Sequence, residues 1–475
     1  MENVNKDGLA MTVLETLAAY QLDSEEGRTH VLLQKQPAML AKVLGLKHWI
    51  REGGLNAGNI SDFLTPYLEH SQHMHHPGYI GHQVAVPHKG AALADMIHGV
   101  INNPMAVYEM GPTASVCERV VVNWMLSKVG WFEGEWDDFT RTDTGGGVLT
   151  HGGSLANLTA VLAARARAYP DAWQNGTPEN AAIIAPAVSH YSVSRAVSIA
   201  GFGQSAILPA PVTDWGVLRP EKLEETYRRG VEAGRDVFMV TANACSTATG
   251  LYDPIDEVAD FCQAHGLWLH IDGAHGASAL ISRKTKSLLK GIARADSLVW
   301  DAHKMLKTSA LCAAVLFKDQ SAMAGTFSQK ASYIFHEGDQ IGFDVGPYAL
   351  ECTKAPLGTK LFLVLAMEGE AALGDFVAKQ YADTQRFYEI IAQQEDFACP
   401  YKPQSNILCF RYKGVRGNAA QSALREAMLA RGRFYITSAE VSGTRYLRLS
   451  VMNPRTTEAT IRALLEEIRL CAKTL

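Results

Sequence analysis

The chain has 475 residues, so two or three domains or subdomains are expected rather than one small core. Hydrophobic residues make up 47% and charged residues 20%, which argues against wholesale disorder, and the net charge of -5 argues against general attraction to nucleic acid or an anionic membrane. No apolar run approaches ~18 residues, and the N-terminus lacks the basic start and apolar centre of a signal peptide. The eight cysteines are scattered without a CxxC pair, as is typical of reduced thiols in a cytoplasm.

Helices are expected first, over residues 1 to about 70, and again in "VCERVVVNWMLSKVGW". From about Gly147 to Lys318, short apolar runs rich in β-formers alternate with amphipathic stretches, beginning where "GVLT" precedes "SLANLTAVLAARARAY". Helices of this length between strands predict right-handed crossovers and a mainly parallel sheet covered on both faces. In such sheets the site lies outside the carboxyl ends of the strands, and Gly152, Asp272 and Lys304 fall at predicted strand ends.

The C-terminal third has a different organisation. "TKLFLVLAMEGEAALGDFVAKQYADTQRFYEIIAQQ" predicts a helix pair interrupted near Gly369 and Gly374. Two strands, "NILCFRY" and "RYLRLSVM", and two helices, over 418–432 and 457–473, follow. They predict a small α/β unit distinct from the parallel sheet.

The stretch "LTHGGSLANL" runs from a strand end to a helix start with two glycines and a serine. Free backbone N–H groups at a helix N-terminus favour an anion, and glycine permits close approach. Gly153 and Ser154 are therefore candidates for holding a phosphate, although Ser154 could equally cap the helix. The chain has no GxxxxGK[ST] motif and no GxGxxG between a strand and a helix, which disfavours nucleotide-binding loops.

Asp272 ends the nearly continuous apolar strand in "LWLHIDGAHGAS". A carboxylate there is costly unless it meets a cation or hydrogen-bond donors, so Asp272 is either a structural cap or ion pair, or the counter-ion of a protonated ring nitrogen. Ala274 is small enough for a flat ring to lie against it. His190, in "AVSHYSVSRA", stands where a strand gives way to a helix, either as a structural residue or as an imidazole stacked on a planar cofactor.

Lys304, in "SLVWDAHKML", is either a solvated charge or a reactive amine. Together with the three features above it supplies what pyridoxal 5'-phosphate requires. A lysine amine binds the aldehyde, a carboxylate keeps the pyridine nitrogen protonated, and a helix start holds the phosphate. The combination, in this order and at strand ends, predicts a pyridoxal-phosphate site.

On these motifs the chain resembles the group II pyridoxal-phosphate amino acid decarboxylases, which have the α/β aspartate aminotransferase fold (fold type I). The resemblance extends from "HHPGYIGHQ" through "GGSLANLTAVLAAR", "SHYSVSRA" and "DAHKM" to "LRLSVMNPRTT". It implies an N-terminal helical segment over 1–75, a cofactor-binding large domain with the mainly parallel sheet over 76–350, and a small C-terminal α/β domain over 351–475. It also implies a homodimer with shared active sites. The Asp-x-His-Lys-Met form and "ECTKAPLGTKLF" look closest to bacterial 2,4-diaminobutyrate decarboxylases.

The resemblance also implies roles for single residues. Lys304 matches the Schiff-base lysine, and His303 its neighbour, which contacts cofactor or substrate. The expected cofactor contacts are Asp272 at the ring nitrogen, Ala274 and His190 on the two ring faces, Gly153 and Ser154 at the phosphate, and Thr247 in the same pocket. Arg448 matches an arginine that contacts the substrate carboxylate, and His82 or Gln83 is expected near the substrate side chain.

The chain departs from its relatives at three places. Asp301 stands where many relatives have asparagine near the phosphate, and Lys354 stands alone where relatives often carry an arginine pair. In many relatives a mobile loop carries a tyrosine that protonates the carbanion left after CO2 departs. Between His336 and Pro347 this chain has none. Phe343 lies near the expected place, with Tyr333, Tyr348 or His336 as possible substitutes, and phenylalanine there favours oxidative deamination in the wider family.

We therefore expect decarboxylation of an L-amino acid to the amine and CO2, with 2,4-diaminobutyrate, glutamate or an aspartate-like substrate favoured. The alternatives are a decarboxylation-dependent oxidative deaminase that yields an aldehyde, a non-decarboxylating transaminase or carbon–sulfur lyase, and a non-catalytic cofactor-binding protein. The residue facing the distal end of the substrate stays open among Glu337, Asp339, Lys354 and Arg445. The six histidines from His70 to His88 lack a regular metal-ligand spacing, so we expect no metal, and we expect no nucleic-acid or membrane partner.

Overall fold

The computed structural model describes residues 8–141, 143–327 and 343–475, and the chain divides into two compact units. The sheet unit comprises Gln83–Ala382 with Pro403–Ser405, and the terminal unit comprises Met1–His82, Asp383–Lys402 and Asn406–Leu475. The N-terminal helices thus group with the C-terminal α/β part, and residues 351–382 group with the large sheet. The division into functional domains at 75 and 350 stays a prediction.

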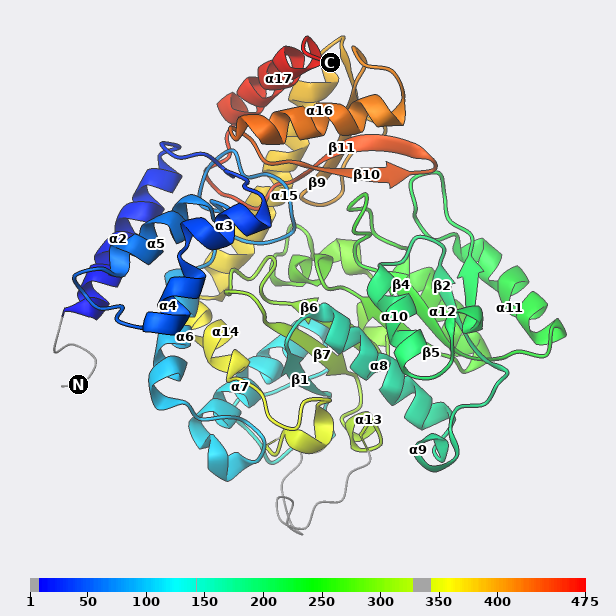
Figure 1. Ribbon diagram of the computed structural model, residues 1–475. Coiled ribbons are helices and arrows are strands. Elements are labelled where there is room, and N and C mark those ends of the chain that lie inside the picture. Colours follow the sequence, from blue (N-terminus) through cyan, green and yellow to red (C-terminus); the bar gives the residue numbers. More distant parts are fainter. Residues whose placement is uncertain (1–7, 142, 328–342) are drawn as a thin grey trace. The chain divides into compact units, whose positions relative to one another are not determined.

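The sheet unit is built on seven strands in the order β1-β7-β6-β5-β4-β2-β3 (Figure 1). Their bounds are β1 Gly146–Thr150, β2 Ala181–Pro186, β3 Ile207–Ala210, β4 Asp236–Asn243, β5 Trp268–Asp272, β6 Ser297–Asp301 and β7 Ala313–Phe317. All neighbouring pairs are parallel except those of β7, which runs antiparallel to both β1 and β6. The predicted mainly parallel sheet is confirmed.

The exception at β7 has a simple cause. Helices link the strands from β1 to β5, as a parallel crossover requires, but only residues 302–312 join β6 to β7 and they contain no helix. A connection this short returns the chain beside β6 in the opposite direction.

The helices of the sheet unit are α6 Lys89–Ile101, α7 Pro112–Val129, α8 Gly153–Ala168, α9 Ala172–Asn175, α10 Tyr191–Ile199, α11 Leu223–Glu232, α12 Ile255–His265, α13 Ser321–Ala324, α14 Leu357–Glu368 and the start of α15 Glu370–Ala392. Every residue of α8 from Ala156 to Arg165 is buried, so the middle of this helix lies inside the unit. Buried polar side chains in such a helix need hydrogen-bond partners, and Asn157 is one of them.

The open edge of β1 is closed by side chains instead of another strand. The Leu149 N–H donates to Glu118 Oε1 at 3.0 Å, and Lys354 Nζ donates both to Leu149 O and to Glu118 Oε1. Glu118 lies on α7, and its side chain and that of Lys354 are almost completely buried. The ion pair therefore satisfies the backbone of β1 where a neighbouring strand would otherwise do so, and β1 leads directly into Gly152 and Gly153.

The terminal unit contains an antiparallel sheet in the order β10-β11-β9-β8. Its strands are β8 Phe397–Ala398, β9 Ile407–Tyr412, β10 Thr437–Val441 and β11 Thr444–Ser450, so β8 and β10 join the two strands predicted from sequence. Its helices are α2 Leu9–Glu25, α3 Pro37–Val43, α4 Leu46–Glu52, α5 Ile60–Glu69, the end of α15, α16 Gly417–Arg431 and α17 Glu458–Ala472. Within the described ranges, no helix is both long enough and apolar enough to span a membrane.

Candidate active site

A cavity of about 260 Å³ lies within the sheet unit, where the ends of β1, β5 and β6 and the residues that follow β2 and β4 meet. All eight predicted cofactor residues line it: Gly153, Ser154, His190, Thr247, Asp272, Ala274, His303 and Lys304. The remaining lining residues are His151, Gly152, Asn157, Ser192, Cys245, His275, Asp301 and Leu311. Gly153 and Lys304, about 150 positions apart in sequence, converge because parallel strands end at the same edge of the sheet.

The predicted phosphate loop forms the N-terminal end of α8. Gly152 has φ +108°, a backbone conformation that side chains disfavour, and it turns the chain from β1 into the helix. A Cβ at Gly153 would lie 2.8 and 2.9 Å from the two carboxylate oxygens of Asp301, so glycine is needed there for close approach. Among the described residues no side chain caps α8, and the first intrahelical bond runs from the Leu155 N–H to Gly152 O, so the N–H groups of Gly153 and Ser154 can donate to an anion in the cavity that both residues line.

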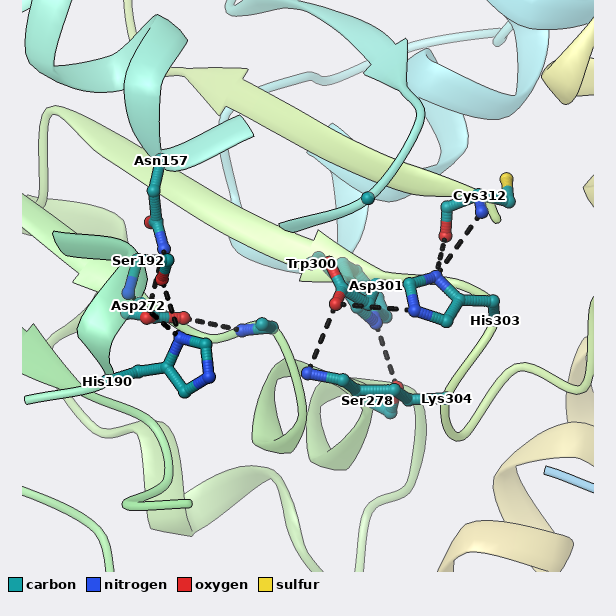
Figure 2. Close-up of polar contacts among 12 residues, drawn as sticks. Asn157, His190, Ser192, Asp272, Ser278, Trp300, Asp301, His303, Lys304 and Cys312 are labelled. Carbon is teal, nitrogen blue, oxygen red and sulfur yellow. Dashed lines mark hydrogen bonds and ion pairs between the residues drawn. The ribbon is translucent and has the colours of Figure 1, made fainter. Parts of the chain in front are cut away.

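Asp272, at the end of β5, is 7% exposed and is held by neutral donors. Asn157 Nδ2 donates to Asp272 Oδ2 at 3.1 Å, and the Ala274 N–H donates to Asp272 Oδ1 at 3.3 Å (Figure 2). None of these partners carries a charge, so they do not form an ion pair with the carboxylate, which can meet a cation in the cavity.

His190 caps α10 and contacts the same group of residues. The Ser192 N–H donates to His190 Nδ1 at 3.3 Å, and Ser192 Oγ lies 2.7 Å from that nitrogen. Burial lowers the pKa of His190, although the nearby Asp272 raises it in part. An imidazole that lines the cavity and whose pKa is lowered by burial suits stacking on a flat ring.

Lys304 follows β6 and points toward Asp301 in the cavity (Figure 2). Its Nζ lies 3.1 Å from Asp301 Oδ2, and His303 Nε2 lies 3.7 Å from the same oxygen. On the other side of its ring, His303 Nδ1 donates to Cys312 O at 2.8 Å, which fixes the orientation of the imidazole. The lysine amine is therefore held at the cavity wall by a carboxylate that is itself almost fully buried.

These features fit pyridoxal phosphate. The uncapped helix start suits its phosphate, Asp272 its ring nitrogen, Ala274 and His190 its two faces, and Lys304 its aldehyde. One feature modifies the fit: Asp301 Oδ1 is buried and has no hydrogen-bond partner among the described residues, and this carboxylate adjoins the helix start. The Asp301 carboxylate therefore repels the phosphate at the start of α8, and the same carboxylate holds the Lys304 amine.

The predicted substrate residues belong to different units. His82 and Arg448 lie in the terminal unit, where Tyr435 Oη is 2.7 Å from His82 Nε2 and Arg448 Nη1 donates to Ser450 Oγ at 2.9 Å. Burial lowers the pKa of His82, and the positive charge of Arg448 lowers it further. Gln83 begins the sheet unit. Their roles at the substrate stay predictions.

The candidates for the distal end of the substrate are now fewer. Lys354 is committed to Glu118 and Leu149 at the edge of β1, so it is removed as a substrate contact. Arg445 pairs with Glu440 on the small sheet. Glu337 and Asp339 lie outside the described residues, as do Tyr333 and His336.

Phe343, the residue expected near the catalytic tyrosine of relatives, belongs to an aromatic cluster. Its ring meets Tyr108 and Phe139 edge-on, with centroid separations of 5.6 and 5.0 Å. Tyr348 follows in a short 3-10 turn over Gly346–Tyr348 and is half-buried.

Sequence reasoning missed three buried residues: Asn157, which donates to Asp272, Ser192, which contacts His190, and His270, which contacts Asn157. A polar residue inside the apolar run "SLANLTAVLAA" was the available signal for Asn157, since a buried amide needs partners.

The histidine-rich segment has structural contacts: His88 Nδ1 accepts from the Gly90 N–H and so caps α6. In the described part of the chain, no three His, Cys, Asp or Glu side chains are grouped as a metal site requires.

Comparison with known proteins places this geometry in a family. Residues 56–413 match the model of the pyridoxal-dependent decarboxylase conserved domain. The chain is 28% identical over 458 residues to human acidic amino acid decarboxylase GADL1, covering 92% of this chain and 85% of that protein. It is 29% identical over 454 residues to rat cysteine sulfinic acid decarboxylase, covering 91% and 89%. The crystal structure of mouse CSAD superposes with a TM-score of 0.88 at 26% identity, covering 98% of each chain. The chain belongs to the pyridoxal-dependent decarboxylase family and is a pyridoxal-phosphate-dependent amino acid decarboxylase of fold type I.

Proposed function

We propose that this enzyme removes the α-carboxyl group of an acidic L-amino acid, with Lys304, Asp272 and His190 as its catalytic residues and His303 beside them. The observation that carries the proposal is that Lys304 and Asp272 line one cavity together with the uncapped start of α8. Glutamate, aspartate and cysteine sulfinate are the favoured substrates. The curated relatives, whose names specify acidic amino acids and cysteine sulfinic acid, support this choice over 2,4-diaminobutyrate.

Bound pyridoxal phosphate supplies an aldehyde that joins the substrate amine and a ring that accepts the electrons released as CO2 leaves. Residues of the chain would bind and orient the cofactor and transfer the protons. Asp272 would hold a proton on the ring nitrogen of the bound cofactor, because its own hydrogen-bond donors are neutral and form no ion pair with it. His190, whose pKa is lowered by burial, would cover one ring face, and Ala274 would leave room at the other. Asp301 orients the Lys304 amine at 3.1 Å, and Lys304 can bind the aldehyde and carry a proton to the product.

For substrate binding we propose Arg448 at a carboxylate and His82 or Gln83 near the side chain. Arg448 is 5% exposed and bonded to Ser450, so its guanidinium is rigid, which suits bidentate recognition of a carboxylate.

A second candidate is a decarboxylase that diverts the reaction to an aldehyde by oxidative deamination. Phe343 favours it: a phenyl ring packed against Tyr108 and Phe139 offers no proton. In this case the enzyme consumes oxygen.

We further propose a cytoplasmic homodimer with shared sites. On α6, Leu93, Met96, Ile97, Val100 and Ile101 are exposed apolar side chains, and a second copy would cover them. None of the eight cysteines, all of which lie in the described residues, forms a disulfide bond, which supports the proposal of a reducing compartment. Light scattering on the eluting protein tests the dimer, with Val100→Asp as the variant expected to weaken it.

The experiment that tests the function measures CO2 release and oxygen uptake in one vessel, with purified protein, pyridoxal phosphate and a panel of amino acids. We expect CO2 from an acidic amino acid, with no oxygen uptake. CO2 matched by oxygen uptake would establish the second candidate. Formation of keto acid without CO2 from every substrate would contradict both.

A further inference from the structure

We propose that Trp268, Ser297, His270 and Asn157 form a directed hydrogen-bond chain that orients Asp272 and leaves its negative charge for the cofactor's ring nitrogen. The inference rests on the proposed role of Asp272 and extends it to positioning residues behind the cavity. Of the four, only Asn157 reaches the cavity, and none of them was among the residues predicted from sequence.

Each neighbouring pair of side chains in this hydrogen-bond chain lies within hydrogen-bond distance. Trp268 Nε1 lies 2.9 Å from Ser297 Oγ, and His270 Nδ1 lies 2.8 Å from the same oxygen. His270 Nε2 lies 2.9 Å from Asn157 Oδ1, and Asn157 Nδ2 lies 3.1 Å from Asp272 Oδ2. All these side chains are buried, so water does not compete for the bonds.

The secondary structure explains why these residues meet. Trp268, His270 and Asp272 alternate along β5 and therefore project from the same face of the sheet. Ser297 starts β6 directly opposite His270 in the parallel pair. Asn157 is presented by α8, one turn after Gly153, so the helix that offers its start to the phosphate also contacts Asp272.

The two ends fix the direction of every bond in the chain. An indole N–H can only donate and an ionised carboxylate can only accept. Asn157 must therefore turn its amide N–H toward Asp272 and its oxygen toward His270, so His270 Nε2 carries the proton. In the neutral ring, His270 Nδ1 then accepts from the Ser297 hydroxyl, whose oxygen accepts from Trp268.

The neutral state of His270 gives the chain its function. Burial lowers the pKa of His270 to about 4, even though Asp272 lies nearby and raises it. A protonated imidazole behind Asp272 would neutralise the negative charge of the carboxylate and so compete with the ring nitrogen of the cofactor. Neutral donors orient the carboxylate without neutralising its charge. Asn157 also donates to Ser192 Oγ at 2.8 Å, and Ser192 contacts His190, so one amide couples the carboxylate to the ring-face histidine.

The test compares binding of pyridoxal phosphate with binding of its 1-deaza analogue, in which carbon replaces the ring nitrogen, to the full-length cofactor-free protein. The variants are Asn157→Ala and His270→Leu, which break the chain. His270→Gln can still accept from Ser297 and donate to Asn157. Thr159→Val is the matched control, because it removes a buried bond on α8 to Leu155 O that lies outside the chain.

We expect Asn157→Ala and His270→Leu to weaken pyridoxal phosphate binding by roughly tenfold, the usual effect of losing a hydrogen bond to a charged group. The deaza analogue should bind these variants with nearly the same affinity as it binds the parent protein. His270→Gln should restore most of the loss, and Thr159→Val should leave the ratio of the two affinities unchanged. Equal losses for both ligands would show a merely structural role and overturn the inference.

Failure of the proposed function gives a different result. A parent protein that binds both ligands equally has no partner for the ring nitrogen at Asp272, and then the function of the carboxylate itself is wrong. A direct check of the chain uses long-range ¹⁵N ring spectra of histidine-labelled cofactor-free protein at neutral pH, with His270→Gln for assignment. We expect the neutral His270 ring protonated at Nε2. A ring protonated at Nδ1, or at both nitrogens, would contradict the direction of the chain.

Discussion

The ion pair between Glu118 and Lys354 at the edge of β1 gives a sharp prediction. Lys354→Met leaves the Glu118 carboxylate buried without a cation and leaves Leu149 O without its donor. Breaking a buried pair in this way costs about 3–5 kcal/mol. Glu118→Gln together with Lys354→Met removes both charges and keeps an acceptor for the Leu149 N–H, so the remaining cost is that of unpaired neutral polar groups, at about 1–3 kcal/mol. The double variant should therefore be more stable than Lys354→Met by about 2 kcal/mol, the difference between the two estimates.

Hydrogen exchange read by mass spectrometry is the appropriate assay, because it resolves the opening of β1 separately from the unfolding of the other unit. We expect the peptide over β1 to lose roughly a hundredfold or more of its protection in Lys354→Met, and to recover part of it in the double variant. Lys360→Met, which breaks a partly exposed pair with Asp95, is the control and should cost no more than about 1 kcal/mol. Unchanged exchange of β1 in Lys354→Met would refute the reasoning that this pair substitutes for a neighbouring strand.

The active site and the histidines His76 and His270 give three further predictions. Gly153→Ala should weaken cofactor binding by at least roughly tenfold in an absorbance titration, because the new methyl group would contact the Asp301 carboxylate at 2.8 Å, and adding Asp301→Ala should relieve the loss. Asp301→Asn should tighten binding of inorganic phosphate to the cofactor-free protein by roughly five- to tenfold in calorimetry, since one negative charge leaves the start of α8, and weaker binding would contradict this. Burial lowers the pKa of His76 and His270 to about 4, from an ordinary value of 6.5 in the unfolded chain. Because the unfolded state then binds more protons, their contribution to stability is complete above pH 6.5 and is lost as the pH falls toward 4, so the urea midpoint should drop over this interval and drop less in His270→Gln.

The site residues that lie at or just after the ends of strands could be predicted from the sequence. Lys304, Asp272 and His190 each follow a recognisable apolar strand, and the carboxyl ends of such strands share one edge of a parallel sheet, so their convergence could be expected before any coordinates. The direction of β7 was missed because its apolar run looks like the others; only the absence of a helix between Asp301 and Ala313 distinguishes it.

The residues behind the site could not be predicted in the same way. His270 reads as one more residue of an apolar strand, and its partners Ser297 and Asn157 come from a neighbouring strand and a helix that are distant in sequence. Lys354 was left open as a substrate contact for the same reason, since nothing in "ECTKAPLG" reveals Glu118 as its partner. Pairing between remote buried polar groups depends on the packing of the elements and not on local pattern.

The measurement that tests the central claim most directly is covalent mapping of the cofactor. Sodium borohydride fixes pyridoxal phosphate to the lysine that holds it, and peptide mass spectrometry then identifies that residue. We predict that the label falls on Lys304 in the parent protein and is lost in Lys304→Ala. A label on the neighbouring Lys307, or on no lysine at all in protein saturated with cofactor, would contradict the account of this cavity as the active site.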